Sequence, residues 1–145
     1  MDTDRADADT PGHTYRMLGR TSRHWWGVVI DAPDPHALAR FYADLMDWKI
    51  VKDEPNFVGV APMGEHVEYL AFQRSPEYVP PQWPPADGKQ QMMLHLDLEV
   101  PDLPAAVEGA VRAGAREAEF QPQADVRVML DPAGHPFCLY IDTAS

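Results

Sequence analysis

The chain has 145 residues, a formal net charge of −11 and a single cysteine, Cys138. This length predicts one domain, or two small modules that share a core, large enough to be stable without disulfides. The acidic balance argues against nucleic acid or an anionic membrane as a partner, because both attract basic patches. The lone cysteine, the lack of a basic-then-apolar leader and the lack of a long apolar run predict a cytoplasmic protein.

Residues 1–24 are predicted to form a flexible N-terminal arm. Four aspartates lie within residues 1–10, and three arginines lie within residues 11–24. A polar and highly charged composition of this kind is typical of a terminus without fixed structure. The alternative is an ordered arm that covers a partner subunit.

Residues 25–75 are predicted to form a first module of one strand, one helix and three strands. The first strand covers 25–31 and the helix covers 34–46, with Asp34 as its N-cap and Pro35 at its first position. The apolar face of this helix consists of Leu38, Phe41, Tyr42 and Leu45. The remaining strands are predicted at 48–53, 56–61 and 66–74.

Residues 76–91 are predicted to form a semi-rigid linker. Five of the chain's 15 prolines lie in this segment, and proline-rich linkers are extended and stiff. Two aromatic residues, Tyr78 and Trp83, interrupt it. They either anchor the linker to the body of the protein or close over a ligand pocket.

Residues 92–142 are predicted to form a second module that begins with a strand over 92–100. From Leu94 to Val100 apolar and polar residues alternate, so His95, Asp97 and Glu99 share one face. A helix over 102–113 begins at the N-cap Asp102 and ends at Gly114. Strands follow at 116–120, 126–130 and 137–141, and the turn Asp131–Gly134 leaves the next residue, His135, exposed.

The two modules repeat one another. DAPDPHALARFY, from Asp31, aligns with EVPDLPAAVEGA, from Glu99, at an offset of 68 residues. Both segments place a Pro-Asp cap between a strand and a helix. We therefore predict an α+β fold of two tandem βαβββ modules. The alternative is that two unrelated units share a helix-cap signal.

The segments VVIDAPDPHALARFY, YLAFQR, HLDLEV and DPAGHPFCLY resemble the vicinal oxygen chelate superfamily. That superfamily includes glyoxalases, bleomycin-resistance proteins and extradiol dioxygenases, and the resemblance is strongest to its glyoxalase-like group. It covers residues 25–142 as a single domain and implies a curved, cup-shaped mixed sheet with helices on the outside, around a shared cavity. It says little about function, because members catalyse unlike reactions or only bind ligands.

The resemblance also implies where a metal would bind. Metal-dependent members carry ligands on the first and last strands of each module. His95 matches a first-strand ligand, whereas the corresponding residue of the first module is Gly27, which cannot ligate. Cys138 stands where the last strand normally carries Glu, and its counterpart is Ala71 or Gln73.

The set of metal ligands is therefore reduced to His95 and Cys138, and no cofactor is expected. A catalytic metal usually needs three or more protein ligands. The alternative is a divalent metal (Zn, Fe, Mn or Ni), with Asp97 as a third ligand and zinc favoured by the thiolate. If the protein is an enzyme, His95 is the expected general base and Asp97 the residue that orients it.

Strand alternation predicts a ligand pocket lined by Trp25, Val29, Tyr69, Gln73, His95, Cys138 and Tyr140. This aromatic and mostly uncharged lining suits a small planar or apolar ligand. We predict a glyoxalase-like protein that binds a small aromatic or antibiotic-like molecule without an intact metal site. The alternative is a metal-dependent lyase, isomerase or dioxygenase with an altered ligand set. The resemblance further implies a homodimer, formed by packing or by exchange of modules.

Overall fold

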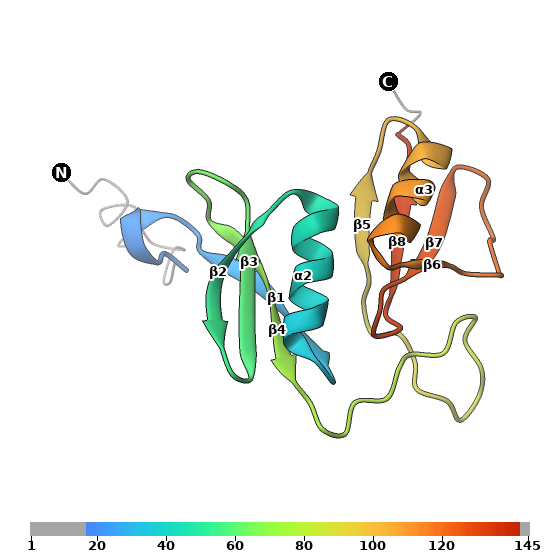
Figure 1. Cartoon of the computed structure of the whole chain (residues 1–145), viewed down its shortest axis with the longest axis horizontal. Coiled ribbons are helices and arrows are strands. Elements are labelled where there is room, and N and C mark those ends of the chain that lie inside the picture. The colour runs from blue at the N-terminus through green and yellow to red at the C-terminus, as the bar shows by residue number, and fades with distance from the viewer. Residues whose placement is uncertain (1–16, 143–145) are drawn as a thin grey trace, which may run out of the picture.

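The computed structural model describes residues 17–142, which form two modules joined by a long connection (Figure 1). A 3-10 helix, η1 (Arg20–Ser22), precedes the first module. The first module consists of β1 (Trp26–Ala32), α2 (Pro35–Met46), β2 (Lys49–Glu54), β3 (Phe57–Ala61) and β4 (Glu68–Arg74). The second consists of β5 (Leu96–Glu99), α3 (Leu103–Ala113), β6 (Arg116–Glu117), β7 (Val126–Leu130) and β8 (Pro136–Tyr140). The predicted α+β fold of two tandem βαβββ modules is confirmed.

Each module contains a four-stranded mixed sheet with the same topology. The strand orders are β1-β4-β3-β2 and β5-β8-β7-β6, so β1 and β5 each lie at a sheet edge. In both sheets the edge strand pairs in parallel with the last strand, and the other pairs are antiparallel. The register places Val29 opposite Ala71 and Asp97 opposite Cys138. Ala71, rather than Gln73, is therefore the counterpart of Cys138.

Both helices begin as the sequence predicts. The side chain of Asp34 accepts a hydrogen bond from the backbone N–H of Ala37 at 3.1 Å, and Asp102 does the same for Ala105 at 3.0 Å. A proline follows each cap, where no N–H is needed. These local signals fix the helix starts without help from the rest of the fold. None of the helices within residues 17–142 is long and apolar enough to cross a membrane.

The helix-bearing faces of the two sheets are turned toward each other and share one core. Tyr42 on α2 stacks on Phe72 of its own sheet, with ring centroids 5.4 Å apart. The rings of Tyr42 and Phe41 each lie 6.0 Å from Phe137 in the second sheet. The opposite faces of both sheets, which carry the predicted pocket residues, therefore point away from this core.

Two predicted strands are shorter than expected. The first strand of the second module pairs only from Leu96, because its partner β8 begins at Pro136, which has no N–H to donate. The strand predicted over 116–120 ends at Glu117. Beyond it, the N–H of Ala118 still donates to the Val128 carbonyl at 3.0 Å, and the side chain of Gln121 adds to this pairing by accepting from the N–H of Val128 at 2.8 Å and donating to its carbonyl at 2.9 Å.

The linker is anchored to the second module by its two aromatic residues. The hydroxyl of Tyr78 donates to the carbonyl of Ala133 at 2.9 Å, and the indole N–H of Trp83 donates to the carbonyl of Phe120 at 3.1 Å. Both residues therefore anchor the linker, and Tyr78 also lines a cavity under it.

The turn after β7 fastens the second module to the first. The fully buried carboxylate of Asp131 accepts hydrogen bonds from the Tyr42 hydroxyl at 2.8 Å and from the N–H groups of Ala133 and His135. The His135 imidazole contacts this carboxylate at 2.8 Å and, through its other nitrogen, the carbonyl of Asp31 at 2.9 Å. The prediction of an exposed His135 is wrong. Its side chain is 18% exposed because its ring bridges the two modules.

Candidate functional site

The second module brings three potential metal ligands together on the exposed face of its sheet. His95 and Asp97 lie two residues apart and share that face, with His95 Nε2 3.1 Å from Asp97 Oδ1. Cys138 lies opposite Asp97 on the neighbouring strand. One ligand atom from each of the three residues lies within 4.8 Å of the others. The sequence analysis gave this group as the alternative to a site reduced to His95 and Cys138, and the parallel β5–β8 pair explains why the three residues lie close together.

The electrostatics of this group keep the thiol protonated. Burial, followed by the charge of Asp97 and a hydrogen bond to Asp97, raises the pKa of Cys138 from 9.0 to about 11. A thiolate is the form that ligates metals and attacks electrophiles. Cys138 is therefore a weak nucleophile at neutral pH, and a metal would have to displace its proton.

The corresponding place in the first module is filled by an aromatic ring. Gly27 pairs with Tyr69 across β1 and β4, and a Cβ atom added to Gly27 would collide with the Tyr69 ring. Glycine thus gives room for the ring to lie across β1. Any side chain long enough to ligate at this position would displace the ring. The first module therefore offers aromatic surface where the resemblance implies a ligand.

The other predicted residues of the first module differ in their surroundings. Val29 is 46% exposed and Gln73 is exposed, whereas the counterpart of Cys138, Ala71, is fully buried. Trp25 is engaged by the arm, since the Arg20 guanidinium lies 4.0 Å from its ring centroid and the His66 ring meets it edge-on at 5.8 Å. Trp25 therefore links the start of β1 to the arm.

The structure does not join the two halves of the predicted pocket. Within residues 17–142, no hydrogen bond, ion pair or ring contact connects Trp25, Val29, Tyr69 and Gln73 to His95, Cys138 and Tyr140. The reason is the shared core, which lies on the other side of both sheets. Each chain therefore presents an aromatic half-site and a polar half-site on separate faces.

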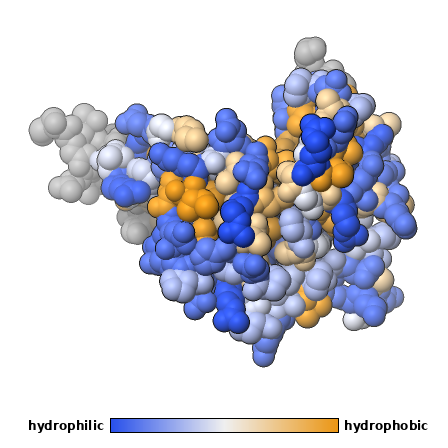
Figure 2. All heavy atoms as spheres, in the orientation of Figure 1, coloured by the Kyte–Doolittle hydropathy of each residue, from blue (hydrophilic) through white to orange (hydrophobic). Residues whose placement is uncertain are grey.

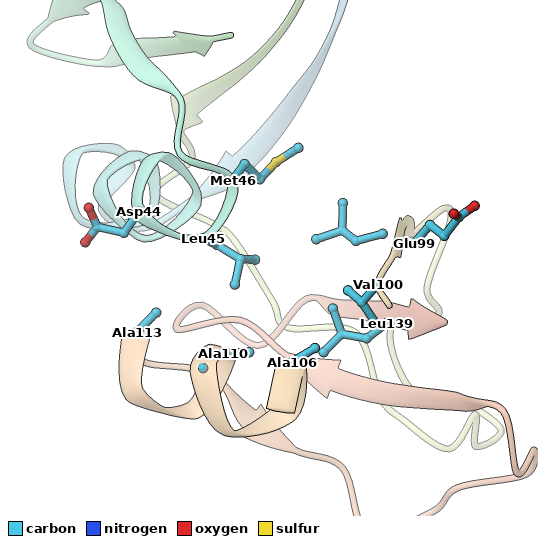
Figure 3. A pocket seen from close by; sticks show the side chains of 11 residues that line it. Asp44, Leu45, Met46, Glu99, Val100, Ala106, Ala110, Ala113 and Leu139 are labelled. Carbon is cyan, nitrogen blue, oxygen red and sulfur yellow. The ribbon is translucent and has the colours of Figure 1, made fainter. Parts of the chain in front are cut away.

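A cavity that the sequence analysis missed lies between the modules (Figure 3). It has a volume of about 480 Å³ and lies between the end of α2, one face of α3 and β5. A signal for it is present in the repeat. At the offset of 68 residues, α3 has small residues where α2 has large ones. The small set is Ala106, Gly109, Ala110 and Ala113, and the large set is Leu38, Phe41, Tyr42 and Leu45.

A second cavity of about 370 Å³ lies under the linker. Val29 lines it together with Tyr78, Leu94 and His135. Of the residues predicted to form the ligand pocket, only Val29 is part of this cavity.

Comparisons with known proteins agree with this architecture. The family model described as "Glyoxalase-like domain" matches residues 27–140. A glyoxalase/bleomycin resistance protein/dioxygenase family enzyme from Burkholderia phytofirmans PsJN has 20% identity and a TM-score of 0.56, over 79% of this chain and 95% of its own. A comparison with curated proteins gives no match.

Two further solved structures share the fold. The fosfomycin resistance protein FosX from Mesorhizobium loti has 12% identity and a TM-score of 0.56, over 82% of this chain and 92% of its own. TnmS3, an antibiotic binding protein from Streptomyces sp. CB03234, has 17% identity and a TM-score of 0.54, over 86% of this chain and 100% of its own. The chain belongs to the glyoxalase-like domain family.

Proposed function

We propose that the protein binds a small aromatic or antibiotic-like molecule on the exposed faces of its sheets. The observation that carries this proposal is the Tyr69 ring, which lies over Gly27 where a metal-dependent member would carry a ligand. Aromatic rings stack on planar ligands, whereas His95, Asp97 and Tyr140 supply the few polar groups that orient them. The names of two structural neighbours, an antibiotic binding protein and a fosfomycin resistance protein, support this class of ligand.

The pocket is completed by a second copy of the chain. Because the half-sites of one chain point away from its core, Tyr69 of one copy and His95 of another have to meet across an interface. Both β1 and β5 are edge strands, whose outer sides can pair with another chain, although the Asp31 carbonyl of β1 is already held by His135. A homodimer of this kind places an aromatic half-site opposite a polar one. We place it in the cytoplasm, which the single free cysteine supports.

Ligand binding is tested by quenching of tryptophan fluorescence with a panel of planar aromatic compounds. We expect saturable quenching by at least one compound, and we expect Tyr69→Ala to weaken that binding by about tenfold or more. Phe120→Ala, which removes another exposed aromatic ring far from the half-sites in sequence, is the control and should bind as the wild type does. Equal binding by the Tyr69→Ala variant would contradict the proposal.

A metal-dependent enzyme is the second candidate, and the grouping of His95, Asp97 and Cys138 favours it. A nitrogen, a carboxylate oxygen and a sulfur fit zinc, although all three come from one module and none from the other. Zinc at this site would supply Lewis-acid chemistry. Asp97 would orient the His95 imidazole, and Cys138 would release its proton on binding.

Metal content, measured by mass spectrometry on protein purified without a metal-affinity tag, tests this candidate. One equivalent of metal in the wild type, lost in His95→Ala and kept in the control His66→Ala, would support a metalloenzyme. No metal in any variant would exclude a resident metal and leave ligand binding as the function.

A further inference from the structure

The cavity between α2 and α3 has an apolar centre and an acidic rim. Leu45, Leu98 and Leu139 contribute to its walls, and the small residues of α3 form its floor. Figure 3 shows the carboxylates of Asp44 and Glu99 on either side of this apolar centre, directed away from it. Among residues 17–142, no basic residue lines it. On the surface, apolar atoms are exposed along the seam between the modules (Figure 2).

Trp26 is a large apolar side chain that is more than half exposed in the part of the chain that the structure describes. It is 57% exposed at the start of the edge strand β1. By alternation it lies on the same side of the sheet as Val28 and Ile30, which pack against the core, and therefore on the side opposite to the half-sites. Tryptophan is among the residues that most often dominate the binding energy of protein interfaces.

The segment before Trp26 is basic in an otherwise acidic chain. Residues 17–25 contain Arg20 and Arg23 and no acidic residue, whereas the whole chain has a net charge of −11. Arg20 stacks on Trp25, and Arg23 is exposed. This charge complements the rim of the cavity, which carries Asp44 and Glu99.

Pairing between edge strands of two copies would bring Trp26 and the basic segment of one copy close to the cavity of the other. If β1 of one copy pairs antiparallel with β5 of another, the start of β1 lies beside the end of β5. The end of β5 is where Leu98, Glu99 and Val100 line the cavity. Trp26 then lies on the side of the joined sheet that contains the cavity. A twofold axis repeats the contact, so that two tryptophans enter two cavities.

We propose that Trp26 of each copy inserts into the cavity between α2 and α3 of a second copy, with Arg23 against its acidic rim. This inference rests on the homodimer of the proposed function and identifies Trp26 as the side chain that anchors that dimer. It also explains the asymmetry of the repeat, since the small residues of α3 make room that the large residues of α2 do not.

The dimer dissociation constant, measured by light scattering or sedimentation over a dilution series, tests the anchor. We expect Trp26→Ala to raise the dissociation constant by at least about thirtyfold. Ala106→Leu fills the cavity with a leucine side chain like that of Leu38, its counterpart in α2. It should raise the dissociation constant by a similar factor without lowering the melting temperature. Val111→Ala, on the exposed face of α3, is the matched control and should leave it unchanged.

If Trp26→Ala fails to fold, exchanging the charges of Arg23 and Glu99 provides a second test of the anchor. Arg23→Glu and Glu99→Arg should each weaken the dimer by several-fold, and together they should restore it.

A wild-type dimer that is insensitive to Trp26→Ala and Ala106→Leu would overturn the anchor while leaving ligand binding intact. A dimer that depends on Trp26 but binds no aromatic compound would retain the anchor and refute the proposed function. A wild-type monomer at micromolar concentration would overturn both the anchor and the composite pocket.

Discussion

At Cys138, burial and the neighbouring carboxylate both favour the neutral thiol. A pKa of about 11 implies roughly a hundredfold less thiolate near pH 8 than at the reference value of 9.0. Asp97→Asn removes the charge while burial remains, so we expect the pKa to fall in part and alkylation by iodoacetamide at pH 8 to be roughly threefold to tenfold faster. Glu119→Gln, an exposed substitution elsewhere, is the control. Alkylation of Asp97→Asn at the wild-type rate would show that Asp97 does not hold the thiol proton.

Tyr42 couples the stability of the protein to alkaline pH. Burial, the charge of Asp131 and the hydrogen bond to Asp131 raise the pKa of Tyr42 well above 10.0. A raised pKa in the folded state stabilises the protein below the unfolded-state pKa, and this contribution is lost as the pH rises above about 10. Tyr42→Phe should therefore cost about 1–3 kcal/mol at pH 7 and reduce the further loss of stability above pH 10.

Urea unfolding at pH 7 and above pH 10 measures both effects of Tyr42→Phe. Part of the alkaline loss should remain in the variant, because the pKa values of Tyr78 and Cys138 are also raised. Tyr140→Phe is the control, since the Tyr140 hydroxyl makes no hydrogen bond within residues 17–142. An alkaline loss as large in Tyr42→Phe as in the wild type would contradict this account of the Tyr42–Asp131 contact.

At the scale of the element, one side chain extends the pairing of a short strand. Gln121 provides a donor and an acceptor to Val128, whose carbonyl also accepts from the backbone N–H of Ala118 at the end of the shortened strand. We expect Gln121→Ala to destabilise the protein by about 1–3 kcal/mol, because the Val128 N–H loses its Gln121 acceptor while the Val128 carbonyl keeps the bond from Ala118. Hydrogen exchange of the Val128 amide should become faster, whereas that of Leu139 in β8 should change only as global stability does. Unchanged protection at Val128 would show that backbone pairing is sufficient.

The elements were predictable where their signals are local. The caps Asp34 and Asp102 and the strand alternation around His95 and Asp97 depend on neighbours in the chain, and the structure confirms them. The length of β5 was not predictable, because it depends on the pairing of a partner strand that begins at Pro136. His135 was also misjudged, since its bridge to Asp31 joins residues 104 positions apart.

The arrangement of the modules is the feature that sequence patterns could not supply. An apolar helix face shows that a surface is buried, but not which sheet buries it. Here Phe41 and Tyr42 of the first module pack on Phe137 of the second, and this contact turns the half-sites outward. The predicted pocket residues lie on the sheet faces opposite this core, and within residues 17–142 the sets from the two modules do not meet in one chain. The fold is therefore complete in one chain, and the proposed pocket requires two.

The whole-molecule account is tested most directly by mapping where a ligand binds. Backbone amide shifts of isotope-labelled protein would be followed during titration with an aromatic compound that quenches fluorescence. We expect saturable shifts near Gly27, Val29 and Tyr69 together with shifts near Cys138 and Tyr140, because the two half-sites form one pocket. Shifts confined to α3 around Ala106 and Ala110, or shifts in only one half-site, would contradict the composite aromatic pocket.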